Sequence, residues 1–451
     1  MRRLFGTDGI RGVAGEFPLD DATVRSIGRA LAHRLHKTEQ KKPRVLLGQD
    51  TRESSSWIAD ALSAALVSTG VEVASAGVIT TPGVAYLAHT RGFAAGVVIS
   101  ASHNPWTDNG IKVFGSDGFK LADATELEIE HEIFTELAAG KEETEAVATV
   151  ATLPGDEALR EAYVEWLASL VARQDFSGLH VMADCANGAA TPIAGDVLRR
   201  IGVKCNLSHN HPSGRNINEK CGALYPEVVA KEVVQRKASL GVAFDGDADR
   251  CLLADANGKV VNGDGILLLA ARELKQSGKL KNNVVVATTM SNMGLELALA
   301  REGIRMVRAP VGDKYVLEEM LKAGANLGGE QSGHILFLDH ATTGDGLLTA
   351  LMVLATLART RKPLHELVGD LKVFPQTIKN VRVREKKPLE DIPEVAQAIR
   401  AAEKALAGNG RVVVRYSGTE ALCRVMVEAE SEALMKQHSG AIAAAVTKAL
   451  A

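Results

Sequence analysis

The chain has 451 residues, a formal net charge of −3 and 24% charged residues. A chain of this length exceeds a single ordinary core, so we expect roughly two to four domains. The near balance of charge gives no bulk attraction to nucleic acid or to anionic membranes, and an aromatic content of 4% leaves few surfaces for base stacking. A small-molecule partner is therefore favoured over nucleic acid or a membrane.

The cysteines and the N-terminus indicate a cytoplasmic protein. The five cysteines are odd in number and far apart, with no C-x-x-C pair, which fits reduced thiols better than a disulfide framework or a zinc site. The first residues lack an apolar signal core. The most membrane-like segment, Leu347–Ala358, is too short to span a bilayer, so we expect a buried helix there.

The first third of the chain predicts a strand followed by a helix. Residues Arg44–Gly48 have the apolar pattern of a strand, and Ser54–Ser68 has the pattern of an amphipathic helix capped by its serine. The polar stretch Ala139–Asp156 then interrupts the pattern and is a candidate domain boundary.

The remaining two thirds repeat this alternation. Residues Leu179–Gly202 predict a strand and then a helix, and Asn282–Thr289 predicts another strand before a helix that begins near Ser291. The pattern weakens over 361–372, and the apolar residues of 411–430 lie between helical stretches. Strands that alternate with helices are typical of an α/β protein.

Several predicted strands end in small or polar residues, as in "VVISASHNP", "VMADCANGA", "GVAFDGDADR", "VVVATTMSN" and "VVVRYSGTE". Ligands of open α/β sheets bind outside the carboxyl ends of the strands. We therefore expect several of these ends to share a central cleft, although many Gly- and Ser-rich strand ends bind nothing.

The stretch "AFDGDADRC" predicts a metal site. It places Asp245, Asp247 and Asp249 at alternate positions directly after an apolar strand. Two like charges about 4 Å apart repel by about 4 kcal/mol at an effective dielectric near 20, and a divalent cation removes that penalty. An all-oxygen ligand set favours Mg²⁺ or Ca²⁺ over zinc. An EF-hand is excluded because Ala256 stands where its glutamate is required; a solvated acidic turn is the alternative.

Arg250 follows the three aspartates and is placed either for a phosphate oxygen or for an ion pair with one of the carboxylates. Ser102 lies at the end of a second apolar strand, beside His103. The surroundings are not a G-x-S-x-G elbow, and adjacent side chains on an extended chain point to opposite faces, so His103 need not reach Ser102. A capping or turn role for Ser102 is the alternative. Lys112, farther along, suits a proton shuttle or a phosphate ligand.

Three further stretches have the composition of ligand loops. "RYSGTE" (Arg415–Glu420) offers a guanidinium, hydroxyls and a glycine, which suit a bound phosphate, although a plain β-turn has the same composition. "GGEQSGH" (Gly328–His334) offers Glu330 and Ser332 to sugar hydroxyls. "FGTDGIRG" (Phe5–Gly12) is a glycine-rich loop that presents Arg11.

Taken together, these five motifs resemble the α-D-phosphohexomutase family, and they occur in the family's order along the whole chain. Ser100 in "SASHNP", Gln331 in "GEQSGH" and the stretch "NINEKCGALYPE" resemble the branch that acts on glucosamine phosphates. The resemblance implies three related α/β domains and a smaller C-terminal α+β domain around a central cleft. We place these domains at 1–153 (serine loop), 154–256 (metal loop), 257–369 (sugar loop) and 370–451 (phosphate loop).

The resemblance also implies a role for each matching residue. Ser102 would carry a phosphoryl group between turnovers and would hold one Mg²⁺ with Asp245, Asp247 and Asp249. Lys112 would be the general acid/base, supported by Arg11, His103 and Arg250. The implied substrate-binding residues are Gly312, Asp313, Lys314, Glu330, Ser332, His334, Arg415, Ser417, Gly418, Thr419 and Arg424.

The implied reaction interconverts glucosamine 6-phosphate and glucosamine 1-phosphate through glucosamine 1,6-bisphosphate, for UDP-N-acetylglucosamine and cell-wall precursor synthesis. Relatives in the family allow a homodimer. Three alternatives remain open: a phosphoglucomutase or phosphomannomutase of the same family, a Mg²⁺-dependent sugar phosphatase, and a non-catalytic phosphosugar sensor. Intact Ser102, Lys112 and the three aspartates argue against the sensor, which needs no phosphoryl acceptor.

Overall fold

The structure is a computed structural model that describes residues 4–6, 8–39, 41–138, 153–417 and 421–450. The described strands form four separate sheets. The chain divides into two compact units, the first made of Met1–Met290 and Ile304–Val368, the second of Ser291–Gly303 and Gly369–Ala451. Within the described residues, no helix combines the length and the apolar character needed to cross a membrane.

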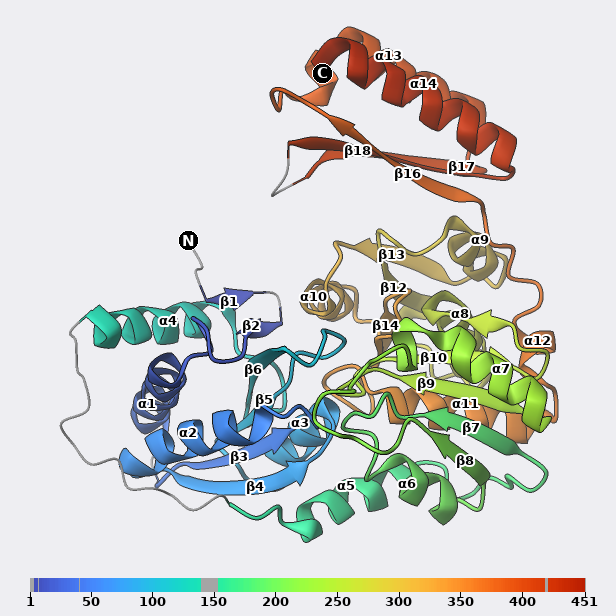
Figure 1. Ribbon diagram of the computed structural model, residues 1–451. Helices are drawn as coiled ribbons and strands as arrows, with labels where there is room; N and C mark the ends of the chain where they lie inside the picture. The colour runs from blue at the N-terminus through green and yellow to red at the C-terminus, as the bar shows by residue number, and fades with distance from the viewer. Residues whose placement is uncertain (1–3, 7, 40, 139–152, 418–420, 451) are drawn as a thin grey trace. The chain divides into compact units, whose positions relative to one another are not determined.

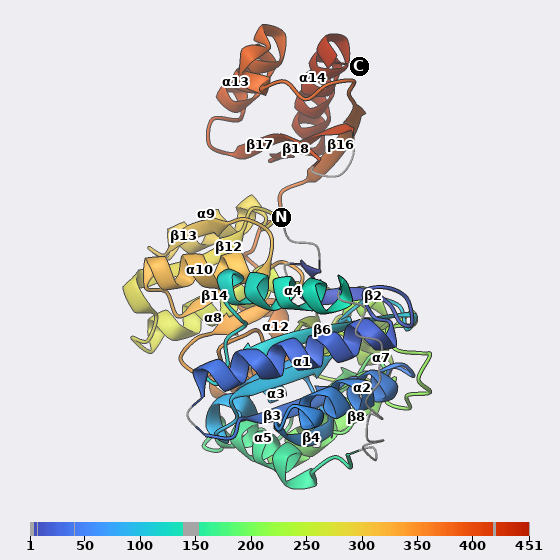
Figure 2. The same cartoon turned by 90° about the vertical axis from the view of Figure 1, so that its left-hand side faces the viewer.

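The first sheet of the first unit is mixed, with strand order β1-β2-β6-β5-β3-β4. Strand β5 lies inside this sheet and is buried throughout, as its Val-Val-Ile run predicts. Helix α1 packs against α2 and α4, and Figures 1 and 2 both show α1 beside α4. The elements of this part are β1 (Phe5–Gly6), β2 (Gly9–Val13), α1 (Asp21–Thr38), β3 (Arg44–Gln49), α2 (Ser55–Ser68), β4 (Glu72–Val78), α3 (Thr81–Thr90), β5 (Ala95–Ile99), β6 (Asp108–Gly115) and α4 (Asp123–Ala138).

The predicted strand at residue 44 and the predicted helix up to Ser68 are confirmed as β3 and α2, but the expected cap of α2 is wrong. Ser54 has helical dihedral angles (φ −76°, ψ −15°) and makes no capping hydrogen bond with its side chain. A residue that is already helical cannot turn its hydroxyl back onto the first turn in the usual way. Side-chain caps do begin α1, where Asp20 accepts from the Thr23 N–H, and α3, where Thr80 accepts from the Gly83 N–H.

The second sheet has strand order β11-β10-β9-β7-β8, with β7 parallel to both β8 and β9. Helix α7 packs against β7, β9 and β10. The strand and helix predicted over 179–202 are confirmed as β7 and α6. The elements of this part are α5 (Glu157–Ser169), β7 (His180–Asp184), α6 (Ala194–Arg200), β8 (Lys204–Ser208), the 3₁₀ turn η1 (Gly222–Leu224), α7 (Pro226–Arg236), β9 (Leu240–Phe244), β10 (Cys251–Asp255) and β11 (Val260–Val261).

The third sheet has strand order β13-β12-β14-β15, with β12 parallel to both of its neighbours. The strand predicted near residue 284 and the buried helix predicted near residue 350 are confirmed as β12 and α11. The elements are α8 (Gly263–Gln276), η2 (Lys281–Asn283), β12 (Val284–Thr288), β13 (Arg305–Ala309), α10 (Asp313–Ala323), β14 (Leu327–Gly329), β15 (Ile335–Phe337), α11 (Gly346–Thr360) and α12 (Leu364–Leu367).

The second unit is a three-stranded antiparallel sheet of order β16-β18-β17, with α13 and α14 on one face (Figures 1 and 2). The apolar sides of these two helices and of the sheet form its core. The helix predicted from Ser291 is confirmed as α9 and belongs to this unit. The elements are α9 (Met293–Arg301), β16 (Gln376–Arg382), η3 (Leu389–Asp391), α13 (Pro393–Leu406), β17 (Gly410–Tyr416), β18 (Leu422–Ala429) and α14 (Glu432–Leu450).

Candidate active site

Ser102 lies in the loop between β5 and β6 and is buried. Its φ of +54° is a left-handed conformation that costs free energy for any residue other than glycine, so surrounding contacts must hold it. Its Oγ donates to Asp245 Oδ2 at 2.6 Å, which joins the serine loop to the predicted metal loop. Its backbone N–H donates to Ser100 Oγ at 3.0 Å.

A buried arginine that the sequence analysis missed fixes this loop. Arg52 donates to the carbonyl oxygens of Ser102, Asn104 and Asp108, each at 2.9 Å, and to that of Pro105. Its charge is balanced by Asp50 at 2.8 Å, and both side chains are fully buried. A planar guanidinium has enough donors to hold several carbonyls at once, so Arg52 sets the path of the loop that presents Ser102.

The three aspartates of the metal loop follow β9 and converge as predicted. One oxygen from each of Asp245, Asp247 and Asp249 lies within 4.8 Å of the others, and all three side chains are buried. Burial raises the pKa of Asp245 well above its usual value, with further contributions from its two acidic neighbours. Oδ1 of Asp247 and Oδ1 of Asp249 are buried and make no hydrogen bond within the described part of the chain.

These orphaned carboxylate oxygens fit a hard divalent cation. Mg²⁺ binds carboxylate and phosphate oxygens and does not require nitrogen or sulfur ligands. The donor set of the loop is all oxygen, including Ser102 Oγ beside Asp245. The residues present therefore fit the predicted Mg²⁺ site.

Lys112 on β6 is almost completely buried among carboxylates. Its Nζ lies 2.8 Å from Asp247 Oδ2, 2.9 Å from Asp8 Oδ2 and 3.9 Å from Asp249 Oδ2. Burial alone would lower its pKa, but the three carboxylates outweigh burial and raise it above its usual value. Lys112 is therefore an ammonium at neutral pH in this arrangement.

His103 does reach Ser102, although the residue pattern provides no reason to expect this contact. His103 Nδ1 lies 3.3 Å from Ser102 Oγ and 3.3 Å from Arg250 Nη1. Adjacent side chains point to opposite faces only on an extended chain, whereas the left-handed backbone of Ser102 turns these two toward one another. Burial, together with Arg250 and Arg11, lowers the pKa of His103, so the imidazole is neutral at pH 7.

Arg250 forms the ion pair considered for it, and its role as a phosphate ligand stays a prediction. Its Nε lies 3.8 Å from Asp249 Oδ1, and its side chain also lines the cavity described below. Arg11 pairs with Asp8 and donates to Asn104 Oδ1 at 3.5 Å. Asp8 was not singled out from the sequence, yet it also binds Lys112 and Lys120, and Lys120 in turn pairs with Asp313.

A cavity of about 410 Å³ lies within the first unit where these loops meet. Of the strand ends singled out in the sequence, those after β5 and β9 contribute to its wall. The β14–β15 turn, which was not among them, contributes as well. The strand ends after β7 and β12 do not line it. Its walls are formed by Leu4, Gly6, Asp8, Gly9, Arg11, His103, Asp249, Arg250, Val311, Gly312, Asp313, Glu330 and His334.

The predicted sugar loop contributes Glu330 and His334 to this cavity. Glu330 Oε1 accepts from the Gly312 N–H at 3.0 Å, and Ser332 Oγ donates to Glu330 Oε2 at 3.2 Å. His334 is buried 3.5 Å from Asp249 Oδ2, and that carboxylate raises the pKa of the imidazole although burial opposes it. Ser332 lies outside the cavity wall and positions Glu330 instead.

Lys314, another of the implied substrate-binding residues, also lies outside the wall of the main cavity. It forms an ion pair with Asp123 and lines a neighbouring cavity of about 170 Å³.

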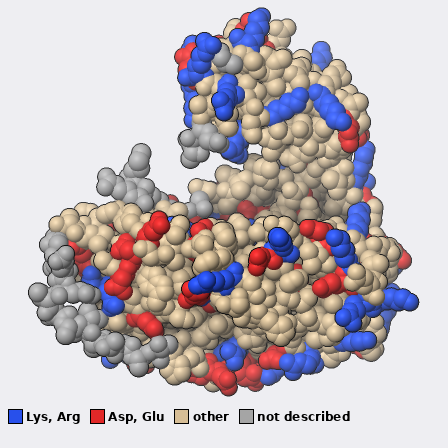
Figure 3. Space-filling model, in the orientation of Figure 1, with Lys and Arg blue, Asp and Glu red and all other residues tan. Residues whose placement is uncertain are grey.

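The predicted phosphate loop lies in the second unit. Arg415 on β17 and Arg424 on β18 are paired across the ladder, and Arg424 Nη2 lies 3.5 Å from Ser417 Oγ. Lys386, which the sequence analysis missed, donates to the Ser417 carbonyl at 2.6 Å. Figure 3 shows Lys and Arg side chains predominating on the visible face of this unit. Gly418 and Thr419 lie outside the described residues.

Comparison with known proteins supports the resemblance. Models of the phosphoglucomutase/phosphomannomutase family match the chain over all four domains: alpha/beta/alpha domain I at residues 2–139, domain II at 161–258, domain III at 262–374 and the C-terminal domain at 378–445. The predicted fold class, three α/β domains and a C-terminal domain, is thereby confirmed.

Three individual proteins are informative. A phosphoglucosamine mutase of Koribacter versatilis is 62% identical and covers 100% of this chain and 98% of its own. The crystal structure of a phosphoglucomutase/phosphomannomutase family protein from Burkholderia thailandensis has a TM-score of 0.76 at 23% identity, with 98% and 97% of the chains covered. N-acetylphosphoglucosamine mutase of Aspergillus fumigatus, solved in complex with GlcNAc-6P and magnesium, has a TM-score of 0.61 at 19% identity, with 100% and 96% covered. With all four domain matches and a full-length relative at 62% identity, the chain belongs to the phosphoglucomutase/phosphomannomutase family, the α-D-phosphohexomutases that its five motifs resemble.

Proposed function

We propose that this chain interconverts glucosamine 6-phosphate and glucosamine 1-phosphate by way of phosphorylated Ser102 and glucosamine 1,6-bisphosphate. One observation carries the proposal: Ser102 Oγ lies 2.6 Å from Asp245, at the edge of three buried carboxylates and beside a cavity of about 410 Å³. The full-length relative at 62% identity, named phosphoglucosamine mutase, supports the amino sugar as substrate.

The charges around Ser102 suit a phosphoryl group. A phosphoserine carries about −1.5 to −2 charges at neutral pH. Arg250 and Arg11 line the cavity, and Lys112 is buried among the metal-loop carboxylates. Phosphoryl transfer depends chiefly on positioning and on neutralising charge, and these three cations would supply both.

Asp245, Asp247 and Asp249 would hold one Mg²⁺ together with an oxygen of the Ser102 phosphoryl group. When bound, the ion neutralises negative charge on that group and on the carboxylates. The orphaned Oδ1 atoms of Asp247 and Asp249 support this assignment, and the magnesium found with the Aspergillus protein is consistent with it.

Lys112 would carry the proton. In each transfer, the oxygen that gives up the phosphoryl group gains a proton and the attacking hydroxyl loses one. The Lys112 ammonium can donate a proton to the oxygen that gives up the phosphoryl group. The amine that remains can accept the proton of the attacking hydroxyl. His103, neutral and 3.3 Å from Ser102 Oγ, would orient that hydroxyl.

Two sets of residues would bind the phosphosugar. Glu330, held by Ser332 and by the Gly312 N–H, would accept hydrogen bonds from sugar hydroxyls. Asp313 and His334, which line the same cavity, and Lys314, which lines the neighbouring one, would also contact the substrate. The phosphate that does not react would be bound by the phosphate loop and its neighbour on β18, namely Arg415, Ser417, Gly418, Thr419 and Arg424. Because this loop would bind either phosphate of the bisphosphate, the intermediate could reorient in the site and transfer its other phosphoryl group to Ser102.

The location and the assembly remain predictions. The free state of all five cysteines is compatible with the expected cytoplasmic location. A homodimer, and the supply of an activated amino sugar for cell-wall precursors, rest on the family resemblance.

The decisive experiment is a ³¹P NMR time course with Mg²⁺, a trace of sugar bisphosphate, and equal amounts of glucosamine 6-phosphate and glucose 6-phosphate. Faster formation of glucosamine 1-phosphate is expected. Faster formation of glucose 1-phosphate would keep the mechanism and move the enzyme to the neutral-sugar branch. Inorganic phosphate alone would show a phosphatase, and binding without any turnover would show a sensor.

A further inference from the structure

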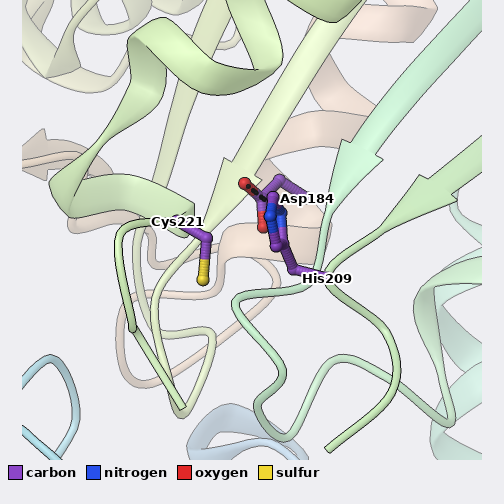
Figure 4. A group of neighbouring side chains, drawn as sticks. All are labelled: Asp184, His209 and Cys221. Atoms are coloured by element: carbon purple, nitrogen blue, oxygen red, sulfur yellow. Dashed lines mark ion pairs between the residues drawn. The ribbon is translucent and has the colours of Figure 1, made fainter. Parts of the chain in front are cut away.

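A second group of metal-ligating side chains lies in the domain of the second sheet, outside the catalytic loops. It consists of Asp184, His209 and Cys221, and Figure 4 shows Asp184 and His209 facing one another with Cys221 alongside. One ligand atom from each lies within 4.8 Å of the others. Asp184 ends β7, His209 follows β8, and Cys221 precedes η1. Three separate segments therefore converge on one point.

The oxygen and nitrogen atoms of this group can each still bind another atom. Asp184 accepts one hydrogen bond on each oxygen, from the Ala186 N–H and the Gly222 N–H, each at 2.9 Å. A carboxylate oxygen can accept two, so each retains a lone pair. Nδ1 of His209 lies 3.1 Å from Asp184 Oδ2 but is buried and makes no hydrogen bond with a described residue. A buried ring nitrogen in this state is costly unless another partner satisfies it.

The surroundings favour a cation. Asp184 is completely buried, and its carboxylate lies near that of Glu232. Oε2 of Glu232 is itself buried without a hydrogen bond to the described part of the chain. His209 is held at φ +45°, a conformation that persists in a non-glycine residue only when its surroundings impose it.

We propose that Asp184, His209 and Cys221 form a Zn²⁺ site. Nitrogen, oxygen and sulfur ligands together suit this borderline ion, whereas Mg²⁺ selects oxygen alone. Three protein ligands leave the fourth tetrahedral position to water. His209, whose side chain is 30% exposed, gives solvent and the ion a path to the site. Binding converts the Cys221 thiol to a thiolate and releases its proton to water.

Such an ion would brace the loop that holds Ser102. Asn218, close to Cys221 in the chain, donates from its backbone to the Ala186 carbonyl at 2.9 Å and from its side chain to the Ser102 carbonyl at 2.9 Å. Gly188 packs so closely on Gly246 of the metal loop that an added Cβ would lie 2.3 Å from the Gly246 oxygen. Asn218 and Gly188 thus connect the site to both catalytic loops, and we expect the ion to hold these loops in position.

Cobalt provides the test, because Co²⁺ replaces Zn²⁺ and a thiolate ligand gives it a strong charge-transfer absorption in the near ultraviolet. The full chain is stripped with chelator, saturated with Mg²⁺ to fill the catalytic carboxylates, and titrated with Co²⁺. We expect the band to saturate at one equivalent and to disappear on addition of Zn²⁺. Absence of the band in the unaltered chain would overturn the proposal.

Variants locate the site. Cys221→Ser should lose the band, whereas Cys205→Ser, which removes a half-buried thiol on the neighbouring strand β8, should keep it. His209→Gln, made at a partly exposed position, should weaken Co²⁺ binding by about tenfold or more. Circular dichroism verifies that each variant is folded; should Cys221→Ser be unfolded, the His209→Gln affinity decides. A full band in folded Cys221→Ser, or unchanged Co²⁺ affinity in His209→Gln, would refute the assignment.

Discussion

The side-chain amide of Asn218 donates to the backbone carbonyl of Ser102 at 2.9 Å, although 116 positions separate the two residues. Arg52 donates to the same carbonyl, also at 2.9 Å. The strained backbone of Ser102 is therefore held from two domains at once. Such contacts keep the reactive hydroxyl of Ser102 in place, although the residues that hold it need not touch the substrate themselves.

Removal of the Asn218 amide should slow turnover. We expect Asn218→Gly to lower kcat by about ten- to a hundredfold, because a small displacement of Ser102 costs alignment. Glycine tolerates the φ of +59° at this position, so backbone strain is not added. Asn283→Gly, at another left-handed asparagine in η2, is the matched control and should leave kcat unchanged. Equal kcat values for the two variants would show that the Asn218–Ser102 hydrogen bond does not contribute to turnover.

Arg52→Lys should destabilise the chain. Lysine keeps the charge but cannot reach four carbonyls at once, so buried carbonyl oxygens lose their donors, and we expect a loss of about 3 kcal/mol in the free energy of unfolding. Urea unfolding followed by circular dichroism measures it. Arg215→Lys, in an exposed pair with Glu53, should change the midpoint little. A similar midpoint shift in both variants would contradict the role given to Arg52.

Ser102→Gly should abolish mutase activity while leaving the fold intact, because no other hydroxyl replaces the phosphoryl acceptor. Glycine again avoids strain at a positive φ. Intact-protein mass spectrometry after incubation with sugar bisphosphate should show one added phosphoryl group on the unaltered chain and none on the variant. Ser100→Ala, which removes a neighbouring buried hydroxyl, should still gain the group. Phosphorylation of the Ser102→Gly variant would place the acceptor elsewhere.

Asp247→Asn should weaken Mg²⁺ binding by about tenfold or more, since the loop loses one anionic ligand. Isothermal titration with Mg²⁺ measures this directly, without relying on activity. Asp255→Asn is the control, because Asp255 is buried at the end of β10 and accepts only backbone N–H groups among its described hydrogen bonds. An unchanged dissociation constant in Asp247→Asn would remove this residue from the ligand set.

Asp345 should make stability depend on pH. It caps α11 and accepts a hydrogen bond from Tyr163 at 2.7 Å, and burial raises its pKa from 3.8 to about 6. The folded chain holds the carboxyl proton of Asp345 more tightly than the unfolded chain does. The stabilising contribution of this proton to the free energy of unfolding is therefore fully present below pH 3.8 and is lost as pH rises through about 6. The loss amounts to about 3 kcal/mol.

Asp345→Asn is the matching variant, since asparagine caps a helix as well as aspartate. The difference in unfolding free energy between the two chains should shift in favour of the variant as pH rises from 4 to 7. A difference that stays constant with pH would show that the carboxyl does not titrate in this range.

The sequence predicted the loops of the site better than their partners. The metal loop could be recognised because its three aspartates are neighbours in the chain, and the serine loop because an apolar strand runs into it. Arg52, Asp8, Lys120 and Asn218 escaped notice, since each acts on a loop distant in sequence. The reach of His103 to Ser102 depended on one left-handed dihedral angle, which no pattern of residue types reveals.

The second metal-ligand group was hidden for the same reason. The spacing of the cysteines relative to one another shows no zinc pattern. Asp184, His209 and Cys221 meet only because parallel strands β7 and β8 bring their carboxyl ends together, and because Gly222 lets the chain turn back at φ +67°.

The shared ion pairs of Asp8 have a consequence for how this site can change over generations. Asp8 contacts Lys112, Lys120 and Arg11, and Lys120 reaches on to Asp313. When one carboxylate serves three cations, the cost of losing any of them depends on which others remain. Substitutions here should therefore show strong epistasis, and compensated pairs of changes should be tolerated where each single change is not.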